Sequence, residues 1–349
     1  MNEQFNTWAD SLRGNKPLAA VIADASATTP KAAGKTTTSN KARAGRSNGK
    51  SVPGMHLGRG YRYGNITWFP IWTDAPVVDR DYITDAVAGK VAVVEGDVPS
   101  VGFLNIKNDC DQPVLLLEGT LLEGGWQHRA VTQTVVVAAK STTQLPVVCV
   151  EAGRWGGAAT QKLGTRRAPA GVRSAIRGVR KSTAGQFMQA APDQGEVWNK
   201  VREFGVRNNK IRPTESLVEM RDEIEAEIAA LKLEKPIPLY GQRGVLIAIG
   251  GITLAAEVFD HPDTLAERLE SILDAYLPES LTKNYKECRS QMARDFLERI
   301  ERVGVDQPEL DGRLRNRPDK YVAAEAVLRN GSLLHMSALN AAHELVLAA

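Results

Sequence analysis

The sequence predicts an α+β protein, with an antiparallel β core over about residues 61–155, C-terminal helices and a late β-hairpin. Short apolar, β-rich runs separated by Gly, Pro, Asn and Asp occupy the first half and favour antiparallel strands. Helical periodicity with capping signals dominates the second half. The pair Asn330-Gly331 lies between two apolar runs and predicts a hairpin. Strands followed by helices are the order typical of α+β folds.

Composition limits the class of protein. The chain has 349 residues, of which 43% are hydrophobic and 24% charged, which is typical of globular domains and excludes collagen-like and disulfide-scaffold proteins. No window approaches the ~20 apolar residues of a membrane helix, and no secretion signal opens the chain. The three cysteines show no C-x-x-C spacing, so neither a disulfide framework nor a structural zinc site is expected. We therefore expect a cytoplasmic protein that does not engage membranes.

The N-terminal region differs from the rest in composition. Residues 25–53 are mostly Ala, Thr, Ser, Gly and basic residues with almost no large apolar side chain. Such a segment cannot offset its ordering entropy, so residues 1–53 are predicted to be a flexible basic tail and residues 54–349 a single α+β domain. Within the tail, Phe5, Trp8 and Leu12 have helical spacing and predict a short docking helix. Ordered structure is expected to resume near Tyr61.

The first half supplies the expected strands. A first strand, residues 66–69, is predicted to end at Pro70, and a helix is expected over 81–88. The other expected strands of this half are residues 91–94, 101–106, 114–117, 131–138 and 145–150.

The second half begins with an Arg/Gly/Ala-rich stretch, residues 151–194, in which a helix over 172–181 is predicted. Four helical segments and a strand pair around Gly250-Gly251 complete the prediction. They are a helix that begins near Glu196, a helix behind the capping box Ser216-x-x-Glu219, a helix behind Thr264-x-x-Glu267, a helix carrying Tyr285 to Ile300, and strands 245–249 and 252–258.

Basic charge is concentrated in two windows. The segments between Asp24 and Asp74 and between Glu151 and Asp193 each contain eight Lys or Arg residues and no acidic residue, although the whole chain carries only +3. The rest of the chain is therefore acidic. Basic windows of this kind bind nucleic acid or phosphorylated ligands, or form solvated loops.

The familiar catalytic signatures are absent. The segment Gly45–Ser51 has one residue too few between its glycines for a P-loop, and Gly58-x-Gly60-x-x-x-Gly64 misses the dinucleotide fingerprint by one residue. The five histidines show no metal-binding spacing, so no metal site is predicted. There is no G-x-S-x-G nucleophile elbow.

A dense polar cluster remains in the β region. Residues 118–129 and 145–155 combine acids, Gln, His, Arg and Trp with glycines beside strongly apolar strands. Glycines allow close backbone approach, and Trp beside Arg offers a stacking surface with a polar neighbour. The candidate catalytic residues are Glu118, Glu151 and His335, and the candidate ligand-binding residues are Trp126, Gln127, His128, Arg129, Arg154 and Trp155.

These residues suggest a chemistry if they converge. Arg129 and Arg154 would hold a phosphate or carboxylate, and a tryptophan would stack on a base. A glutamate would act as general base with His128 or His335 as acid. The alternative is a buried ion-pair network, with Glu118 bonded to Arg129 or Arg154, that only stabilises the fold.

The same residues carry a resemblance to a known family. The motifs are Glu118-Gly119, Gly124-Gly125-x-Gln127-x-Arg129 and Pro146-Val147-x-Cys149-x-Glu151-x-Gly153-Arg154-Trp155. They resemble the bacterial ARG-and-rhodanese-phosphatase-associated protein family over about residues 61–339, with His128 where an Asn is expected. The resemblance implies genomic company with ADP-ribosylglycohydrolase-type and phosphatase-type proteins, often in bacterial conflict settings. It implies no mechanism.

The function expected from these observations is binding of, or action on, a phosphorylated, nucleotide-like small molecule, ADP-ribose-related compounds included, in a defence context. One alternative is a nucleic-acid-binding protein that uses the basic tail and the Arg-rich stretch. Another is a non-catalytic partner of a neighbouring enzyme. The residues leave open whether the site is catalytic and whether it takes a cofactor.

Overall fold

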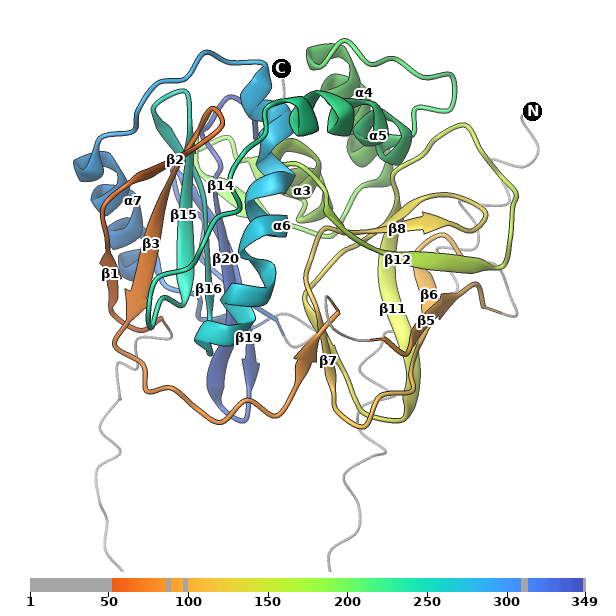
Figure 1. Cartoon of the computed structure of the whole chain (residues 1–349), viewed down its shortest axis with the longest axis horizontal. Helices are drawn as coiled ribbons and strands as arrows, with labels where there is room; N and C mark the ends of the chain where they lie inside the picture. Colours follow the sequence, from red (N-terminus) through yellow and green to blue (C-terminus); the bar gives the residue numbers. More distant parts are fainter. Residues whose placement is uncertain (1–51, 86–88, 97–99, 309–312, 348–349) are drawn as a thin grey trace, which may run out of the picture.

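A computed structural model describes residues 52–85, 89–96, 100–308 and 313–347 (Figure 1). The expected tail up to residue 51, with its Phe5-Trp8-Leu12 segment, lies outside the described residues. Val52 is already buried in the core, and the first strand, β1, spans Met55–Leu57. Ordered structure therefore begins ahead of Tyr61, because Val52 and Met55 pack into the same apolar cluster.

Nine strands form the larger sheet, in which every neighbouring pair is antiparallel. The order is β1-β3-β15-β16-β20-β19-β18-β17, and β2 also pairs with β3. The remaining strands are β2 (Tyr61–Tyr63), β3 (Ile66–Thr73), β15 (Gly244–Ile249), β16 (Ile252–Phe259), β17 (Gln307–Pro308), β18 (Arg313–Arg315), β19 (Val322–Arg329) and β20 (Ser332–Asn340).

Strand β3 does not end at Pro70 as the sequence predicted. It continues to Thr73, and Pro70 pairs in register with Val245 of β15. On its other edge β3 is bonded first by β2 and then by β1, and Pro70 lies where one strand gives way to the other. Its carbonyl accepts a hydrogen bond from Gly58 there. Proline is tolerated because no neighbouring strand needs its missing N–H.

Both predicted hairpins of the second half are confirmed. Strands β15 and β16 are joined at Gly250-Gly251, and β19 and β20 at Asn330-Gly331. Asn330 and Gly331 both have positive φ, 52° and 78°, as a tight two-residue hairpin turn requires. This second hairpin brings His335 and Ser337 into the centre of the sheet.

Six strands close into a barrel in the order β11-β6-β5-β12-β8-β9. They are β5 (Val91–Val94), β6 (Phe103–Asn108), β8 (Thr120–Gly124), β9 (Arg129–Val131), β11 (Ser141–Cys149) and β12 (Thr160–Arg167). A small sheet, β10-β7-β4, lies beside the barrel and comprises β4 (Ile83–Thr84), β7 (Val114–Leu116) and β10 (Val135–Val137). The helix expected over 81–88 is thus wrong in its described part, because Ile83 and Thr84 pair in parallel with β7.

The described helices are α3 (Ala170–Ile176), α4 (Gln194–Arg207), α5 (Leu217–Ala230), α6 (Pro262–Leu281) and α7 (Ser290–Val303). The Ser216 half of the capping box of α5 is confirmed, since the Ser216 hydroxyl accepts from the Glu219 N–H, whereas the Glu219 carboxylate accepts from the Thr214 hydroxyl. Helix α6 begins two residues before Thr264, because the His261 ring caps it. Among the helices that the structure describes, none is long and apolar enough to cross a bilayer.

The helix expected over 172–181 is shorter and begins earlier. Helix α3 ends at Ile176 and is followed by Gly178, whose φ of +60° breaks the helical path. The chain then forms strand β13 (Val179–Lys181), which pairs with β14 (Phe187–Gln189). The Arg-rich stretch is therefore largely structured, since β12, α3, β13 and β14 all lie within it.

Helices cover both faces of the large sheet (Figure 1). Helix α6 packs its leucine and isoleucine side chains on one face and lies between the sheet and the barrel, whereas α7 covers the other face. Helices α3, α4 and α5 pack together against barrel residues such as Leu121 and Val148. A further apolar cluster joins the barrel strands to the small sheet, since it includes Val114 and Leu116 of β7 and Val137 of β10. The barrel and the large sheet therefore meet along α3, α6 and β12.

Candidate functional site

The candidate residues separate into two clusters. Glu118 and His335 belong to a buried ion network between the barrel and the large sheet, which we call the central network. Gln127, His128, Arg129, Glu151 and Arg154 gather around Cys149 on β9, β11 and the loops that flank them, which we call the Cys149 cluster.

In the central network, the Glu118 carboxylate accepts from Arg173 of α3 and from Arg177, the residue that caps the C-terminal end of this helix. The carboxylate lies 2.7 Å from Nη2 of Arg173 and 2.9 Å from Nη2 of Arg177. Arg167 on β12 donates from Nε and Nη2 to the Glu118 carbonyl. Gly119, with φ +81°, allows this packing, because a Cβ there would lie 3.2 Å from the Arg173 side chain. The sequence expected Glu118 to meet Arg129 or Arg154, and the structure corrects this to the arginines of β12 and α3.

Glu257 on β16 is the second acid of this network. Both of its oxygens lie 2.8 Å from Nη1 of Arg167, and Oε1 lies 3.0 Å from Nη1 of Arg173. His335 on β20 reaches Glu257 at 3.4 Å through Nε2 and the Thr134 hydroxyl at 3.0 Å through Nδ1. These two acids and the three arginines are fully enclosed. The third arginine, Arg177, has its charge balanced by Glu325 of β19, whose Oε1 lies 3.8 Å from Nε of Arg177.

The acids of the central network stay ionised and its histidine stays neutral at neutral pH. Burial alone would raise the pKa of Glu118, but Arg173 and Arg177 outweigh it and lower that pKa to about 2. Arg167 and Arg173 likewise hold the pKa of Glu257 well below its usual value against the effect of burial. Burial lowers the pKa of His335, which favours the neutral imidazole. The arrangement is that of a structural ion network, in which neither acid is free to accept a proton.

The Cys149 cluster lies at the end of strands β9 and β11. The Cys149 thiol donates to Oε1 of Gln127 at 2.9 Å, and its sulfur lies 2.8 Å from Nη1 of Arg129. Gln194, the first residue of α4, holds the Cys149 backbone by accepting from its N–H and donating to its carbonyl. Burial raises the pKa of the Cys149 thiol to about 11, so the group is a hydrogen-bonding thiol at neutral pH.

Glu151 and Arg154 form a second part of this cluster. The fully buried Glu151 carboxylate accepts from Nε and Nη2 of Arg154, the latter at 2.8 Å, and from the His128 N–H at 2.9 Å. The other Arg154 donors bond to the carbonyls of residues 124, 125 and 156. Nδ1 of His128 accepts from the Gly124 N–H. Arg154 has no donor left for a ligand.

Arg129 differs from Arg154 in keeping open donors. Its Nη1 bonds to the Val101 carbonyl and to Cys149, whereas Nε and Nη2 have no hydrogen-bond partner among the described residues. No carboxylate within the described ranges forms an ion pair with it, although its side chain is buried. Nε and Nη2 are the parallel pair of donors with which Arg154 holds Glu151. The Nε–Nη2 edge of the Arg129 guanidinium, which is the edge that binds carboxylates and phosphates in two parallel hydrogen bonds, is therefore not used by the described residues.

The two candidate tryptophans lie near this cluster and are exposed. Trp155 is 60% exposed and Trp126 is 36% exposed. Their segments are joined, because the Gly156 N–H donates to the Trp126 carbonyl. Their rings are available for stacking, although nothing in the described part of the chain stacks on them.

Most of the basic charge of the Arg-rich stretch is internal. Arg167, Arg173 and Arg177 are buried in the central network, and Arg166 pairs with Glu123, Asp222 and Glu225. Arg154 is bonded to Glu151. Lys162 and Lys181 remain exposed. The stretch therefore does not form the broad basic surface that its composition suggested.

No group of three or more potential metal-binding side chains occurs within the described residues.

The family model for the ARG and Rhodanese-Phosphatase-superfamily-associated Protein domain matches residues 54–339, and the chain belongs to this family. Neither the curated proteins nor the solved structures give a match.

Sequence reasoning missed the partners of Glu118. Glu257, Arg167, Arg173 and Arg177 were not candidates, although Arg173 and Arg177 lie four residues apart and so share one face of α3. That spacing was the available signal. The many basic residues of the stretch made this spacing inconspicuous. Whether an arginine is buried depends on an acidic partner that is distant in sequence, so the spacing by itself did not predict burial.

Proposed function

We propose that the chain binds a small phosphorylated, nucleotide-like molecule, with ADP-ribose-related compounds among the candidates, and that Arg129 holds its phosphate. One observation carries the proposal: among the described residues the buried Arg129 has no carboxylate partner, its Nε is buried without a hydrogen bond, and its Nη2 forms none. A buried charge without a partner costs several kcal/mol, on the order of the penalty for breaking a buried ion pair. A bound anion would remove this cost.

The surroundings of Arg129 support an anion rather than a cation. The Val101 carbonyl and Cys149 hold the guanidinium through Nη1, and Glu151 is neutralised by Arg154. The exposed rings of Trp126 and Trp155 offer stacking surfaces for a base next to this cluster. The proposal concerns binding, because Glu118 and Glu151 are each held by arginines and neither is open for proton transfer.

A thermal-shift series tests the proposal. ADP-ribose, NAD and nucleoside phosphates should raise the melting temperature of the native chain, because a ligand that binds only the folded state stabilises it. Arg129→Lys should lose this response, since a lysine keeps the charge but not the paired donors. The matched control is Arg221→Lys, because Arg221 is also buried and donates only to backbone carbonyls.

A second pair of variants tests stacking. Trp155→Ala should weaken nucleotide binding, whereas Tyr240→Ala should not, although Tyr240 is the more exposed aromatic residue. Loss of about 1–3 kcal/mol of binding energy is expected for one stacked base. The proposal is wrong if no phosphorylated compound binds, or if Arg129→Lys and Arg221→Lys respond alike.

The alternative function is nucleic-acid binding through the basic tail, with association with a partner enzyme as a further proposal. Arg154, Arg166, Arg167, Arg173 and Arg177 are paired internally, so this alternative depends mainly on the basic residues of the N-terminal region. Binding of DNA and RNA by the full chain and by residues 52–349 should then differ, with a steep dependence on salt. Equal and weak binding by both would eliminate this alternative.

A further inference from the structure

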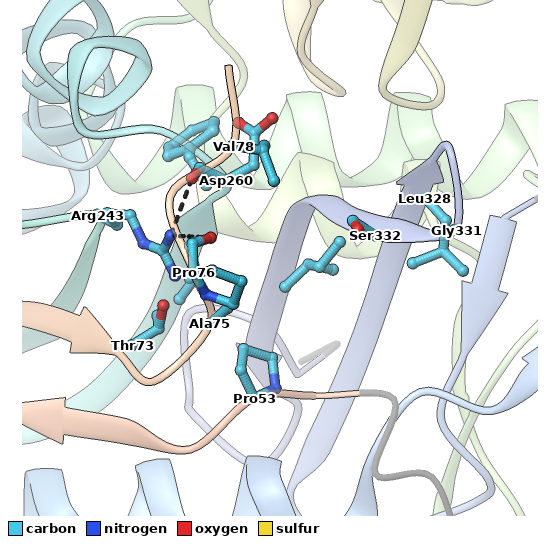
Figure 2. Close-up of a pocket in the computed structure, with 13 residues that line it drawn as sticks. Pro53, Thr73, Ala75, Pro76, Val78, Arg243, Asp260, Leu328, Gly331 and Ser332 are labelled. Carbon is cyan, nitrogen blue, oxygen red and sulfur yellow. Dashed lines mark hydrogen bonds between the residues drawn. The ribbon is translucent and has the colours of Figure 1, made fainter. Parts of the chain in front are cut away.

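A cavity of about 290 Å³ lies at the side of the large sheet (Figure 2), and none of its lining residues belongs to the central network or to the Cys149 cluster. Its walls are the segment that follows β3, the end of β16 and the turn of the β19–β20 hairpin. Most of the lining is apolar and includes Val78, Phe259, Leu328 and Leu333. The volume is at the lower end of the range for small-molecule sites, so a nucleotide would not be enclosed by it.

Arg243 is the cationic residue of this wall. Only 3% of it is exposed, and its Nη1 donates to the carbonyls of Pro76 at 3.2 Å and Asp260 at 3.0 Å, the bonds drawn in Figure 2. In the part of the chain that the structure describes, these two Nη1 bonds are the hydrogen bonds of its side chain, and Nε and Nη2 form none. The Thr73 hydroxyl, also in the wall, is buried without a partner.

Other arginines of the chain show which group the Nε and Nη2 donors of Arg243 would bind. Arg299 donates from Nε and Nη2 to both oxygens of Asp319 at 2.8 Å, and Arg329 donates in the same way to Asp81. In Arg243 this pair of donors is open. A planar carboxylate fits such a pair with two parallel hydrogen bonds.

The charge of the wall favours a singly charged anion. Asp260 contributes a half-buried carboxyl group, which accepts from the Tyr82 hydroxyl and does not pair with Arg243. Burial raises the pKa of Asp260 and lowers the pKa of Arg243, and the charge of Asp260 offsets only part of the effect of burial on Arg243. A phosphate dianion would meet repulsion from an ionised Asp260. A monocarboxylate would bring one negative charge and place its apolar body against the apolar lining.

We propose that this cavity binds a small monocarboxylic acid with an apolar body, with the carboxylate on Nε and Nη2 of Arg243 and the body between Val78, Phe259 and Leu333. This site is separate from Arg129. It needs no nucleotide, and it neither requires nor excludes the function proposed above.

The test is a thermal-shift and calorimetric series on the full chain with isobutyrate, isovalerate, isocaproate and phenylacetate. At least one of these acids should bind and raise the melting temperature. Isoamylamine, which has the apolar skeleton of isocaproate without the carboxylate, should not bind, and inorganic phosphate should bind more weakly. Arg243→Lys should weaken carboxylate binding about tenfold or more, because the paired donors are lost.

Controls separate loss of the site from loss of the fold. Ser332→Trp blocks the cavity from an exposed position at its rim and should abolish binding, whereas Ser290→Trp, at the exposed start of α7, should not. Arg221→Lys and Arg129→Lys should bind the acid normally. The proposal is overturned if no carboxylate binds, if isoamylamine binds as well as isocaproate, or if Ser332→Trp leaves binding intact. Each of these results would leave the proposed nucleotide site untouched, because that site is tested separately by the loss of nucleotide binding in Arg129→Lys.

Discussion

Arg173 of helix α3 and Glu118 of the barrel form an ion pair that has no exposed surface, with 2.7 Å between Nη2 and Oε2. The same guanidinium donates to the Tyr276 hydroxyl of α6 and lies 3.0 Å from Glu257 of the large sheet. One side chain thus connects the barrel, two helices and the sheet. Removing it would leave two buried carboxylates with fewer partners than they need.

We expect Arg173→Met to destabilise the chain by about 3–5 kcal/mol, because an uncompensated charge stays buried. Arg202→Met, which breaks the exposed pair of Arg202 with Glu215, should cost about 0–1 kcal/mol. Urea unfolding of both variants measures the difference. The double variant Glu118→Gln with Arg173→Met should cost less than the two single changes added together, because fewer charges are left unbalanced. Equal costs for Arg173 and Arg202 would show that the central network does not stabilise the fold.

The second prediction concerns pH and Glu279 of α6. Burial raises the pKa of this carboxyl group from 4.5 to about 7, although the N–H groups of Ala170 and Gly171 donate to it. The folded chain therefore binds more protons than the unfolded chain between these two values. The free energy of unfolding should fall as the pH rises through this window, by up to about 3 kcal/mol from this group.

Glu279→Gln removes that titration. The stability of the variant relative to the native chain should therefore increase as the pH rises from below to above the window. Glu267→Gln is the control with the opposite sign. Burial raises the pKa of Glu267, but hydrogen bonds from Arg80 and Thr84 lower it below its usual value. This variant should lose relative stability as the pH rises towards 4.5, and its relative stability should change little between 4.5 and 7, where Glu267 is already ionised in both states. The prediction is contradicted if urea titrations at the two ends of the Glu279 window show no gain in the relative stability of Glu279→Gln, or the same gain for Glu267→Gln.

The third prediction concerns thiol reactivity. Cys149 and Cys288 are buried and burial raises each pKa to about 11, whereas Cys110 is only half-buried. In the native chain Cys110 should therefore react with a disulfide reagent much faster than the other two, and all three should react in denaturant. Cys110→Ser should remove the fast phase. A fast phase that persists in this variant would show that the Cys149 cluster opens in solution.

The local elements were predictable wherever the signal was contained in a short segment. The Asn330-Gly331 hairpin and the Ser216 cap each depend on backbone preferences of a few neighbouring residues, and both formed as expected. Strand β12 was not recognised, because its side chains Gln161, Leu163 and Arg167 alternate with basic and small residues. Its identity as a strand depends on pairing with β5 and β8, which the local pattern does not contain.

The candidate site was predictable in part. Gln127, Arg129, Glu151 and Arg154 do gather around Cys149, since they lie on adjacent strands β9 and β11 or directly beside them. Glu118 and His335 belong elsewhere, because the burial of Glu118 against α3 brings it under Arg173 and Arg177 instead. Arg243 was not singled out at all. Its open donors become visible only when the segment after β3 and the last hairpin enclose it.

By itself the sequence determined the α+β class, the family, the two hairpins and the absence of the common catalytic motifs, because each of these follows from residue types at short, fixed spacings. Only the tertiary structure decided which charged side chains are paired within the fold and which keep unused hydrogen-bond donors. Arg154 and Arg129 are both arginines next to a strand, yet one is saturated by Glu151 and its neighbouring carbonyls and the other is not. Whether a guanidinium serves the fold or a ligand depends on acids and carbonyls far away in the sequence, and folding alone brings these together.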